Sequence, residues 1–315
     1  MKDNLGRDIY FLRLSVTDRC NLRCIYCIPE TGVKKLRQED LISTAEITEI
    51  VRVAALCGIT KVRVTGGEPL LRSELVEICR QIAQTQGINE LCITTNGILI
   101  PKFAKELKAA GVNRLNISLD SLNRETYMEV KREDLFDEAL EGVRVAIETG
   151  FSSIKINAVL IGGVNDKDIL DMLELTRKHM VNVRFIEIMP IGECAKWAAS
   201  RFVSSKHVLQ IAPQLEKVGT DGVSILYKLP DGLGTVGLIS PVSSHFCPTC
   251  NRIRVTPDAI LKPCLHSDCE INLRGMHGEQ LEKVMRNAIF NKPVKHELDS
   301  GSGSACIRNM NMIGG

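Results

Sequence analysis

Hydrophobic residues recur in two alternating patterns along the first 190 positions of the chain. Short runs with a two-residue period predict strands at 11–16, 61–67, 90–97, 114–120, 153–160 and 183–189. Longer stretches with a three- to four-residue period predict helices at 44–58, 73–87, 101–111, 134–150 and 166–180. This alternation is typical of βαβ units with a parallel sheet. We therefore expect an α/β fold, in the form of an incomplete (β/α)6 barrel of the TIM type.

Several of the predicted strands carry polar side chains on one face. Lys61, Arg63 and Thr65 alternate with valines. Asn116, Ser118 and Asp120 alternate in the same way with apolar residues. Successive side chains of a strand point to opposite faces, and a fully buried parallel strand is usually apolar on both. We expect a barrel whose interior holds a polar ligand. The alternative is that these strands lie at an edge or are half exposed.

The pattern changes near residue 190. A short helix at 201–210, strands at 224–229, 234–240 and 250–257, and a helix at 278–290 predict an α+β extension. We divide the chain into a barrel (1–195), an extension (196–299) and a tail (300–315) that ends in Gly314 and Gly315. The Ser/Gly composition of the tail predicts a flexible end.

Charge and hydropathy exclude several classes of protein. The formal charge is only +2 over 315 residues, which argues against nucleic acid as a partner. No apolar run approaches the roughly 18 residues that cross a membrane, and the first twenty residues are too charged for a signal peptide. We expect a cytoplasmic protein with no membrane partner.

Three closely spaced cysteines, Cys20, Cys24 and Cys27, follow the first predicted strand. Twelve cysteines in a chain of this length are too sparse for a disulfide scaffold, and their short spacings indicate metal binding or redox chemistry. Three thiolates suit a [4Fe-4S] cube with one iron left open. A structural zinc ion normally needs a fourth protein ligand, and no His or Cys lies close by in the sequence.

A second cysteine set, Cys247, Cys250 and Cys264, lies in the extension. It suits either another cube with an open iron or a zinc site completed by His266 or Cys269. Several cations lie in predicted strands, where we expect them to bind a polyphosphate through charge-assisted hydrogen bonds. They are Arg13, Lys61, Arg63, Lys155, Arg184, Arg252 and Arg254. The remaining cysteines, Cys57, Cys79, Cys92, Cys194 and Cys306, are expected to be inert.

The first motif resembles that of the radical S-adenosylmethionine (SAM) superfamily, in which an aromatic residue, here Tyr26, precedes the third cysteine. The turn TGGEP at 65–69 matches the glycine-rich turn of that superfamily. The resemblance implies that Cys20, Cys24 and Cys27 hold a [4Fe-4S] cluster whose open iron binds SAM.

Over nearly the whole chain, the sequence resembles the GTP 3',8-cyclase family of molybdenum cofactor biosynthesis. The matching motifs are CNLRCIYC, KVRVTGGEP, TTNG, NISLD, KINAV, VRFIEIMP, CPTCNRIRVT, KPCL and the terminal Gly-Gly. The resemblance implies a second [4Fe-4S] cluster on Cys247, Cys250 and Cys264. It implies SAM contacts from Tyr26, Gly67, Ser118 and Met189. It implies GTP contacts from Arg13, Lys61, Arg63, Thr94, Lys155, Arg184, Arg252 and Arg254. Catalytic roles are implied for Arg13, Arg252, Arg254, Gly314 and Gly315.

The reaction implied is the cyclisation of GTP to (8S)-3',8-cyclo-7,8-dihydroguanosine 5'-triphosphate. It would need an electron donor, a next enzyme that takes the product, and, by resemblance, a homodimer. Two alternatives stay open: a radical SAM enzyme that modifies a peptide or small molecule with an auxiliary cluster, and a zinc or iron-sulfur protein that binds nucleic acid. Met189 has the opposite parity to Arg184, so we expect it beyond the strand end or after a bulge.

Overall fold

The computed structural model describes residues 1–296, 298 and 304–314. The strands are β1 (Phe11–Ser15), β2 (Lys61–Thr65), β3 (Glu90–Thr95), β4 (Arg114–Ser118), β5 (Ser153–Leu160), β6 (Asn182–Glu187), β7 (Glu216–Asp221), β8 (Ser224–Lys228), β9 (Thr235–Ile239), β10 (Arg252–Val255), β11 (Ile260–Lys262) and β12 (Ile271–Asn272). The α-helices are α1 (Thr44–Leu56), α2 (Leu75–Gln84), α3 (Ile100–Ala109), α4 (Arg124–Lys131), α5 (Phe136–Thr149), α6 (Ile169–Lys178), α7 (His207–Ile211) and α8 (Gly278–Phe290). None of the helices in the described part of the chain is long and apolar enough to cross a bilayer.

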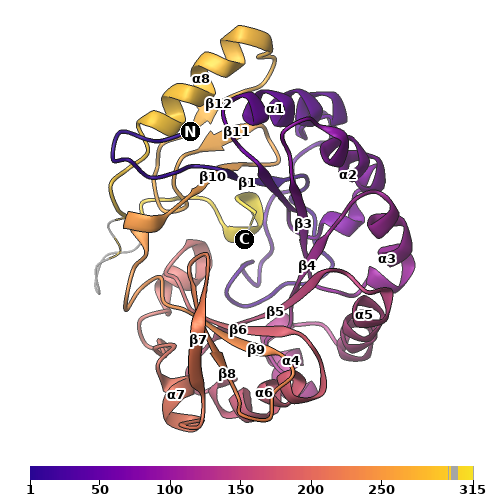
Figure 1. Cartoon of the computed structure of the whole chain (residues 1–315), viewed down its shortest axis with the longest axis vertical. Helices are drawn as coiled ribbons and strands as arrows, with labels where there is room; N and C mark the ends of the chain where they lie inside the picture. The colour runs from indigo at the N-terminus through magenta and orange to yellow at the C-terminus, as the bar shows by residue number, and fades with distance from the viewer. Residues whose placement is uncertain (297, 299–303, 315) are drawn as a thin grey trace.

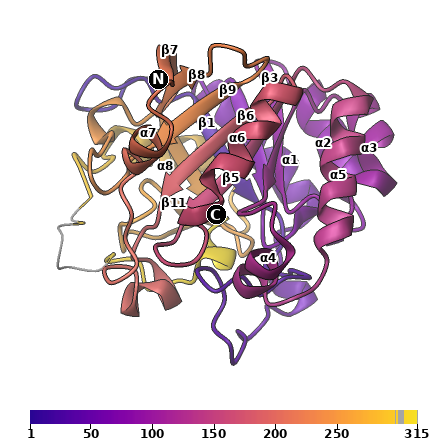
Figure 2. The ribbon, with the colours of Figure 1, turned by 90° about the horizontal axis from the view of Figure 1, so that it is seen from below.

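All these strands join one twelve-stranded sheet, in the order β12-β11-β10-β1-β2-β3-β4-β5-β6-β9-β8-β7. The central run from β10 through β1 to β6 and on to β9 is parallel, and the pairs at both ends are antiparallel. In Figure 1 the strands follow an arc, with the C-terminal segment inside it. Figure 2 shows α2, α3 and α5 side by side on the outer side of the sheet.

The six predicted barrel strands and their helices are present, which confirms the parallel α/β fold. The predicted extension is more closely joined to the barrel than an appended region would be, since β9 and β10 pair in parallel with β6 and β1. The sequence patterns did not predict α4, β7, β11 or β12.

Local sequence signals explain where the outer helices begin and end. Ser43 caps α1 by accepting from the backbone N–H of Glu46, whose side chain accepts from the Ser43 backbone in return. Gly150 ends α5 in the left-handed conformation, where a side chain would be strained. The apolar faces of these helices pack on the sheet in one large core. The five cysteines expected to be inert are all buried.

Candidate functional site

A cavity of about 380 Å³ lies within the arc of strands. Apart from Gly314, every predicted site residue in the described part of the chain lines it. These are Arg13, Cys20, Cys24, Tyr26, Cys27, Lys61, Arg63, Gly67, Thr94, Ser118, Lys155, Arg184, Met189, Cys247, Cys250, Arg252, Arg254 and Cys264. Met189 lies beyond the end of β6, as its parity predicts.

The two cysteine sets lie at opposite edges of the sheet. Cys20, Cys24 and Cys27 come after the carboxyl end of β1, while Cys247 and Cys250 come before the amino end of β10. Since β1 and β10 are parallel and in register from Phe11↔Arg252 onward, these two ends are opposite edges. The cavity therefore extends along the strands, from the first cysteine set at their carboxyl ends to the second set at their amino ends.

The first cysteine loop is folded back on itself and tied to α4. The N–H groups of Cys27 and Ile28 both donate to Cys24 O, at 2.9 and 3.0 Å, and Ile25 N donates to Val130 O at 2.9 Å. Burial, and then the nearby Cys24, raise the pKa of Cys20 to about 12. Partly buried thiols that raise one another's pKa are suited to a cationic metal centre, which would stabilise their thiolates.

The Gly66-Gly67 turn after β2 packs directly against this loop. Gly67 N donates to Thr17 O at 2.7 Å, and a Cβ on Gly67 would lie only 2.3 Å from Arg19 O. A glycine is therefore required for the two backbones to approach this closely. The next residue, Glu68, is buried and accepts from Thr95 Oγ1 and Asn96 N at 2.8 and 2.7 Å.

A buried ion pair beneath the first loop was missed by the sequence patterns. Lys131, at the end of α4, contacts Asp120 at 2.5 Å, and both side chains are 1% exposed. Tyr26 donates its hydroxyl to the same Asp120 oxygen at 2.9 Å. Burial lowers the pKa of Lys131, but Asp120 outweighs it and keeps the pKa above its usual value. Asn123, which caps α4 through Thr126 N, was the signal that could have revealed this helix.

Buried arginines surround the middle of the cavity. Arg13 and Arg254 are neighbours on β1 and β10, and both donate to the carbonyl of Gly314, at 3.2 and 2.8 Å. Burial and the adjacent Arg252 lower the pKa of Arg254 to about 10. Cations that destabilise one another in this way favour an anionic ligand.

Two buried polar atoms at the cavity have no partner among the described residues. They are Thr94 Oγ1 and Asn157 Oδ1. Buried hydroxyls and amides are nearly always hydrogen-bonded. Two such atoms without a partner at a cavity therefore indicate a polar ligand. Together with the cations, these atoms fit a nucleotide.

The second cysteine set sits among basic residues. Cys247 begins a short 3-10 helix (Cys247–Thr249) and Cys250 follows its end, and Cys250 N donates to Cys247 O at 3.2 Å. Burial raises the pKa of Cys250, but Lys292 and Arg252 outweigh it and lower the pKa to about 7. A thiol that ionises near neutral pH is a good metal ligand.

The two residues considered as fourth ligands differ in position. Cys269 is exposed and does not line the cavity, whereas His266 is buried and does. Burial, and then His296, lower the pKa of His266 to about 3, so its ring is neutral. Over the described residues, no three His, Cys, Asp or Glu side chains converge on one ion-sized point. The cysteines of a cube bind separate irons and need no such convergence.

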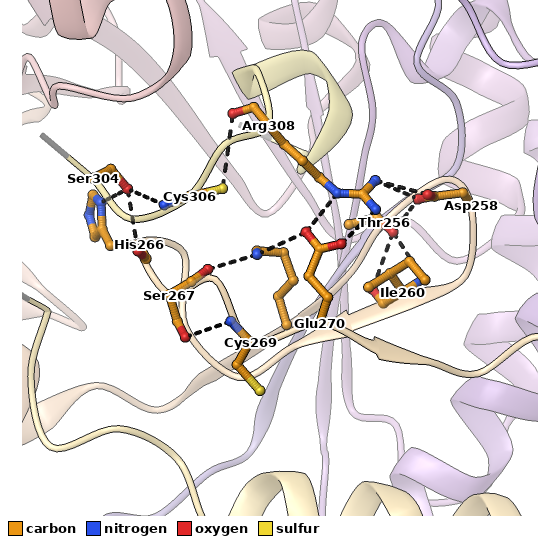
Figure 3. Close-up of polar contacts among 11 residues, drawn as sticks. Thr256, Asp258, Ile260, His266, Ser267, Cys269, Glu270, Ser304, Cys306 and Arg308 are labelled. Atoms are coloured by element: carbon orange, nitrogen blue, oxygen red, sulfur yellow. Dashed lines mark hydrogen bonds and ion pairs between the residues drawn. The ribbon is translucent and has the colours of Figure 1, made fainter.

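The C-terminal segment 304–314 enters the cavity region and is fixed by Arg308 (Figure 3). Arg308 pairs with Glu270 at 2.7 and 2.8 Å and with Asp258 at 2.9 and 3.0 Å. Asn311 and Ile313 are each 1% exposed. This packing differs from the flexible end that the composition predicts, while Gly315 lies outside the described residues.

Comparisons with known proteins bear directly on this arrangement. The model of the Radical SAM superfamily matches residues 14–176, and that of Molybdenum Cofactor Synthesis C matches residues 181–298. GTP 3',8-cyclases from Alkaliphilus oremlandii and Alkaliphilus metalliredigens are 45% and 46% identical to this chain, over 100% of both chains. The chain belongs to the GTP 3',8-cyclase family. This family membership confirms the resemblance seen in the motifs.

Solved structures outside the GTP 3',8-cyclase family share the fold. Streptococcus suis SuiB bound to S-adenosylmethionine aligns with a TM-score of 0.63 at 14% identity, over 91% of this chain and 65% of that one. Coproporphyrinogen III oxidase (HemN) from Escherichia coli, a radical SAM enzyme, aligns with a TM-score of 0.50 at 16% identity, over 81% of this chain and 64% of that one. At such identities the likeness extends to the fold alone.

Proposed function

We propose that the chain is a radical SAM cyclase that converts GTP to (8S)-3',8-cyclo-7,8-dihydroguanosine 5'-triphosphate, the first step of molybdenum cofactor biosynthesis. The full-length relatives named GTP 3',8-cyclase support this function. The observation that carries it in the structure is the row of largely buried cations between two sets of three cysteines, which lie at opposite ends of the parallel strands. A nucleoside triphosphate bound between the two cysteine sets, with SAM at the first set, would match this layout.

Membership of the radical SAM superfamily implies one [4Fe-4S] cluster and SAM. In the proposal Cys20, Cys24 and Cys27 hold that cluster, and the SAM contacts come from Tyr26, Gly67, Ser118 and Met189. When bound, the cluster and SAM supply the electron transfer that cleaves SAM to a 5'-deoxyadenosyl radical. The Gly66-Gly67 turn offers backbone that a ligand can approach closely.

The rest of the cavity binds GTP in this proposal. A second [4Fe-4S] cluster on Cys247, Cys250 and Cys264 would face the base. The hydroxyl of Thr94, which has no partner among the described residues, would bind the base or the ribose. Lys61, Arg63, Lys155 and Arg184 would hold the triphosphate. Arg13, Arg252 and Arg254 would bind GTP nearer the reacting atoms and stabilise negative charge that develops there.

The terminal glycines have a positioning role in the proposal. The Gly314 carbonyl accepts from Arg13 and Arg254 and so orients both guanidinium groups. Deletion of Gly314 and Gly315 should abolish turnover while the iron content stays unchanged.

The proposal also includes a boundary between two domains at about residue 195, a cytoplasmic location, a homodimer and a separate electron donor.

Anaerobic incubation with SAM, GTP and a strong reductant tests the function. We expect 5'-deoxyadenosine and a cyclic product derived from GTP, and near eight irons per chain. Cys264→Ser should lose about half of the iron, whereas Cys269→Ser, at an exposed thiol outside the cavity, should lose none. Deoxyadenosine formed equally with and without GTP would contradict GTP as substrate and favour an enzyme that acts on a peptide.

A further inference from the structure

A carboxylate occupies part of the cationic end of the cavity. Asp221 lies at the end of β7, and its Oδ2 atom accepts from both Lys155 Nζ and Arg184 Nη2, the latter at 2.6 Å. Both cations are nearly buried, with side chains 5% and 7% exposed, whereas Asp221 is 34% exposed. One oxygen thus bridges two buried cations, as an oxygen of a phosphate group would.

Neighbouring residues of β6 and β9 fix Arg184, whereas the carboxylate lies on a loosely held element. Arg184 Nε donates to Asn182 Oδ1 at 2.6 Å, which orients the guanidinium. Gly237 of β9 lies alongside, and a Cβ there would come within 2.9 Å of Arg184 Cγ. Asp221 belongs instead to the hairpin β7–β8, whose strand β7 is largely exposed and pairs with β8 alone. Edge hairpins of this kind open at low cost.

A second acidic residue provides a contrast. Glu90 pairs with Lys61 at 2.5 Å and with Arg114 at 2.9 Å, but it lies within β3 between two strands and does not line the cavity. Glu90 therefore acts as a permanent counter-ion. Asp221, together with Gly222 and Val223 of the hairpin turn, does line the cavity and lies where a ligand would meet it.

We propose that Asp221 stands in for a phosphate group between Lys155 and Arg184, and that its displacement by the substrate sets the affinity for the triphosphate. The inference rests on the proposed function, because it takes GTP as the ligand. In the empty site the carboxylate offsets the repulsion between two buried cations. On binding, the hairpin turn moves outward and the phosphate oxygens take over both hydrogen bonds.

The charge balance explains why the carboxylate is needed. Burial, and then Arg184, lower the pKa of Lys155 to about 8, while Asp221 opposes that shift. The empty site thus keeps its lysine charged at neutral pH and ready for an anion. The same carboxylate repels the incoming phosphates, so affinity is lower than the cations alone would give.

The test is equilibrium binding to the anaerobic holoenzyme without SAM or reductant, so that no turnover occurs. Asp221→Asn should bind GTP about fivefold more tightly than wild type, the value of one partly exposed ion pair. The gain should be smaller for GDP and absent for guanosine, which has no phosphate. The control is Asp231→Asn, which removes the same charge from a surface pair with Arg177 outside the cavity and should change nothing.

Three results would overturn the inference. An unchanged GTP affinity in Asp221→Asn would show that the carboxylate does not compete with phosphate. An equal gain for guanosine would show that the variant merely opens the cavity. A loss of affinity that grows with added Mg²⁺ would make Asp221 a ligand of a metal ion shared with the phosphates. If the wild-type protein binds no GTP at all, the proposed function fails, and with it the assumption that GTP is the ligand.

Discussion

Replacement of Lys131 by methionine isolates the buried ion pair beneath the first cysteine loop. The change keeps most of the length of the side chain but leaves Asp120 buried. Among the described residues, the carboxylate then has only the N–H of Val159 and the hydroxyl of Tyr26 as partners, at 2.7 and 2.9 Å. Removing one member of a buried pair costs about 3–5 kcal/mol, because the other charge stays uncompensated. The pair is 1% exposed on both sides, so water cannot compensate.

The expected loss is large enough to measure by calorimetry. The unfolding entropy of a chain of 315 residues is about 0.7 kcal/mol/K, so the cost corresponds to a midpoint lowered by about 5–8 °C. Scanning calorimetry of the anaerobic holoprotein measures it. Asp120→Asn combined with Lys131→Met should recover most of the loss, because no buried charge remains.

The matched control is Arg144→Met, which breaks the ion pairs of Arg144 with Glu141 and Glu148 on the exposed face of α5. All three side chains are exposed, so the midpoint should scarcely change. If Lys131→Met lowers the midpoint no more than Arg144→Met does, the buried pair does not stabilise the loop and the reasoning is refuted.

Three further predictions concern the ligands and the tail. GTP affinity should be constant between about pH 7, where the terminal phosphate is largely ionised, and about pH 8, and should fall as the pH rises further. Burial lowers the pKa of Lys155 to about 8 in the empty site, and bound phosphates raise it again. Calorimetric titration at several pH values measures the affinity, and a flat profile above about pH 8 would contradict the prediction. Gly67→Ala should weaken SAM binding by about tenfold or more, because its Cβ would lie 2.3 Å from Arg19 O. Equilibrium binding measures the affinity, and an unchanged value would show that SAM binding does not need the close approach of the two backbones. Arg308→Met should speed proteolysis of residues 304–314, which its pairs with two carboxylates hold in place. The control is Arg124→Met, which breaks a similar two-carboxylate cluster at the surface and should leave that rate unchanged. Equal rates of proteolysis in both variants would show that Arg308 does not hold the segment in place.

The barrel was predictable because its signals are local. Period-two strands such as 61–65 and helices such as α1 show their apolar faces within a few residues, and the structure has them at nearly the expected bounds. The cysteine loops and the alternating cations were equally visible. The polar side chains of one strand face were expected to meet a ligand. Those of β2 and Ser118 of β4 line one cavity, whereas Asn116 does not.

The residues missed by the sequence patterns depend on contacts that no local pattern carries. The helix α4 has charged residues at half of its positions and buries only Thr126, Tyr127, Val130 and Lys131, so its apolar period is weak. Asp221 lies in an exposed hairpin strand without a motif, and only the fold brings it to Lys155 and Arg184. The parallel pairing of β10 with β1 likewise joins distant segments.

The pairing of β1 with β10 has a consequence for the synthesis of the chain. Arg7, just before β1, donates to Cys247 O across 240 residues of sequence. At about 5–20 residues per second, a ribosome needs about 12 s or more to make that intervening stretch. During this time one edge of β1 stays unpaired and open to wrong partners. Chaperones that protect such edges would therefore raise the yield of active protein, and a chain that stops short of β10 should aggregate rather than form a smaller enzyme.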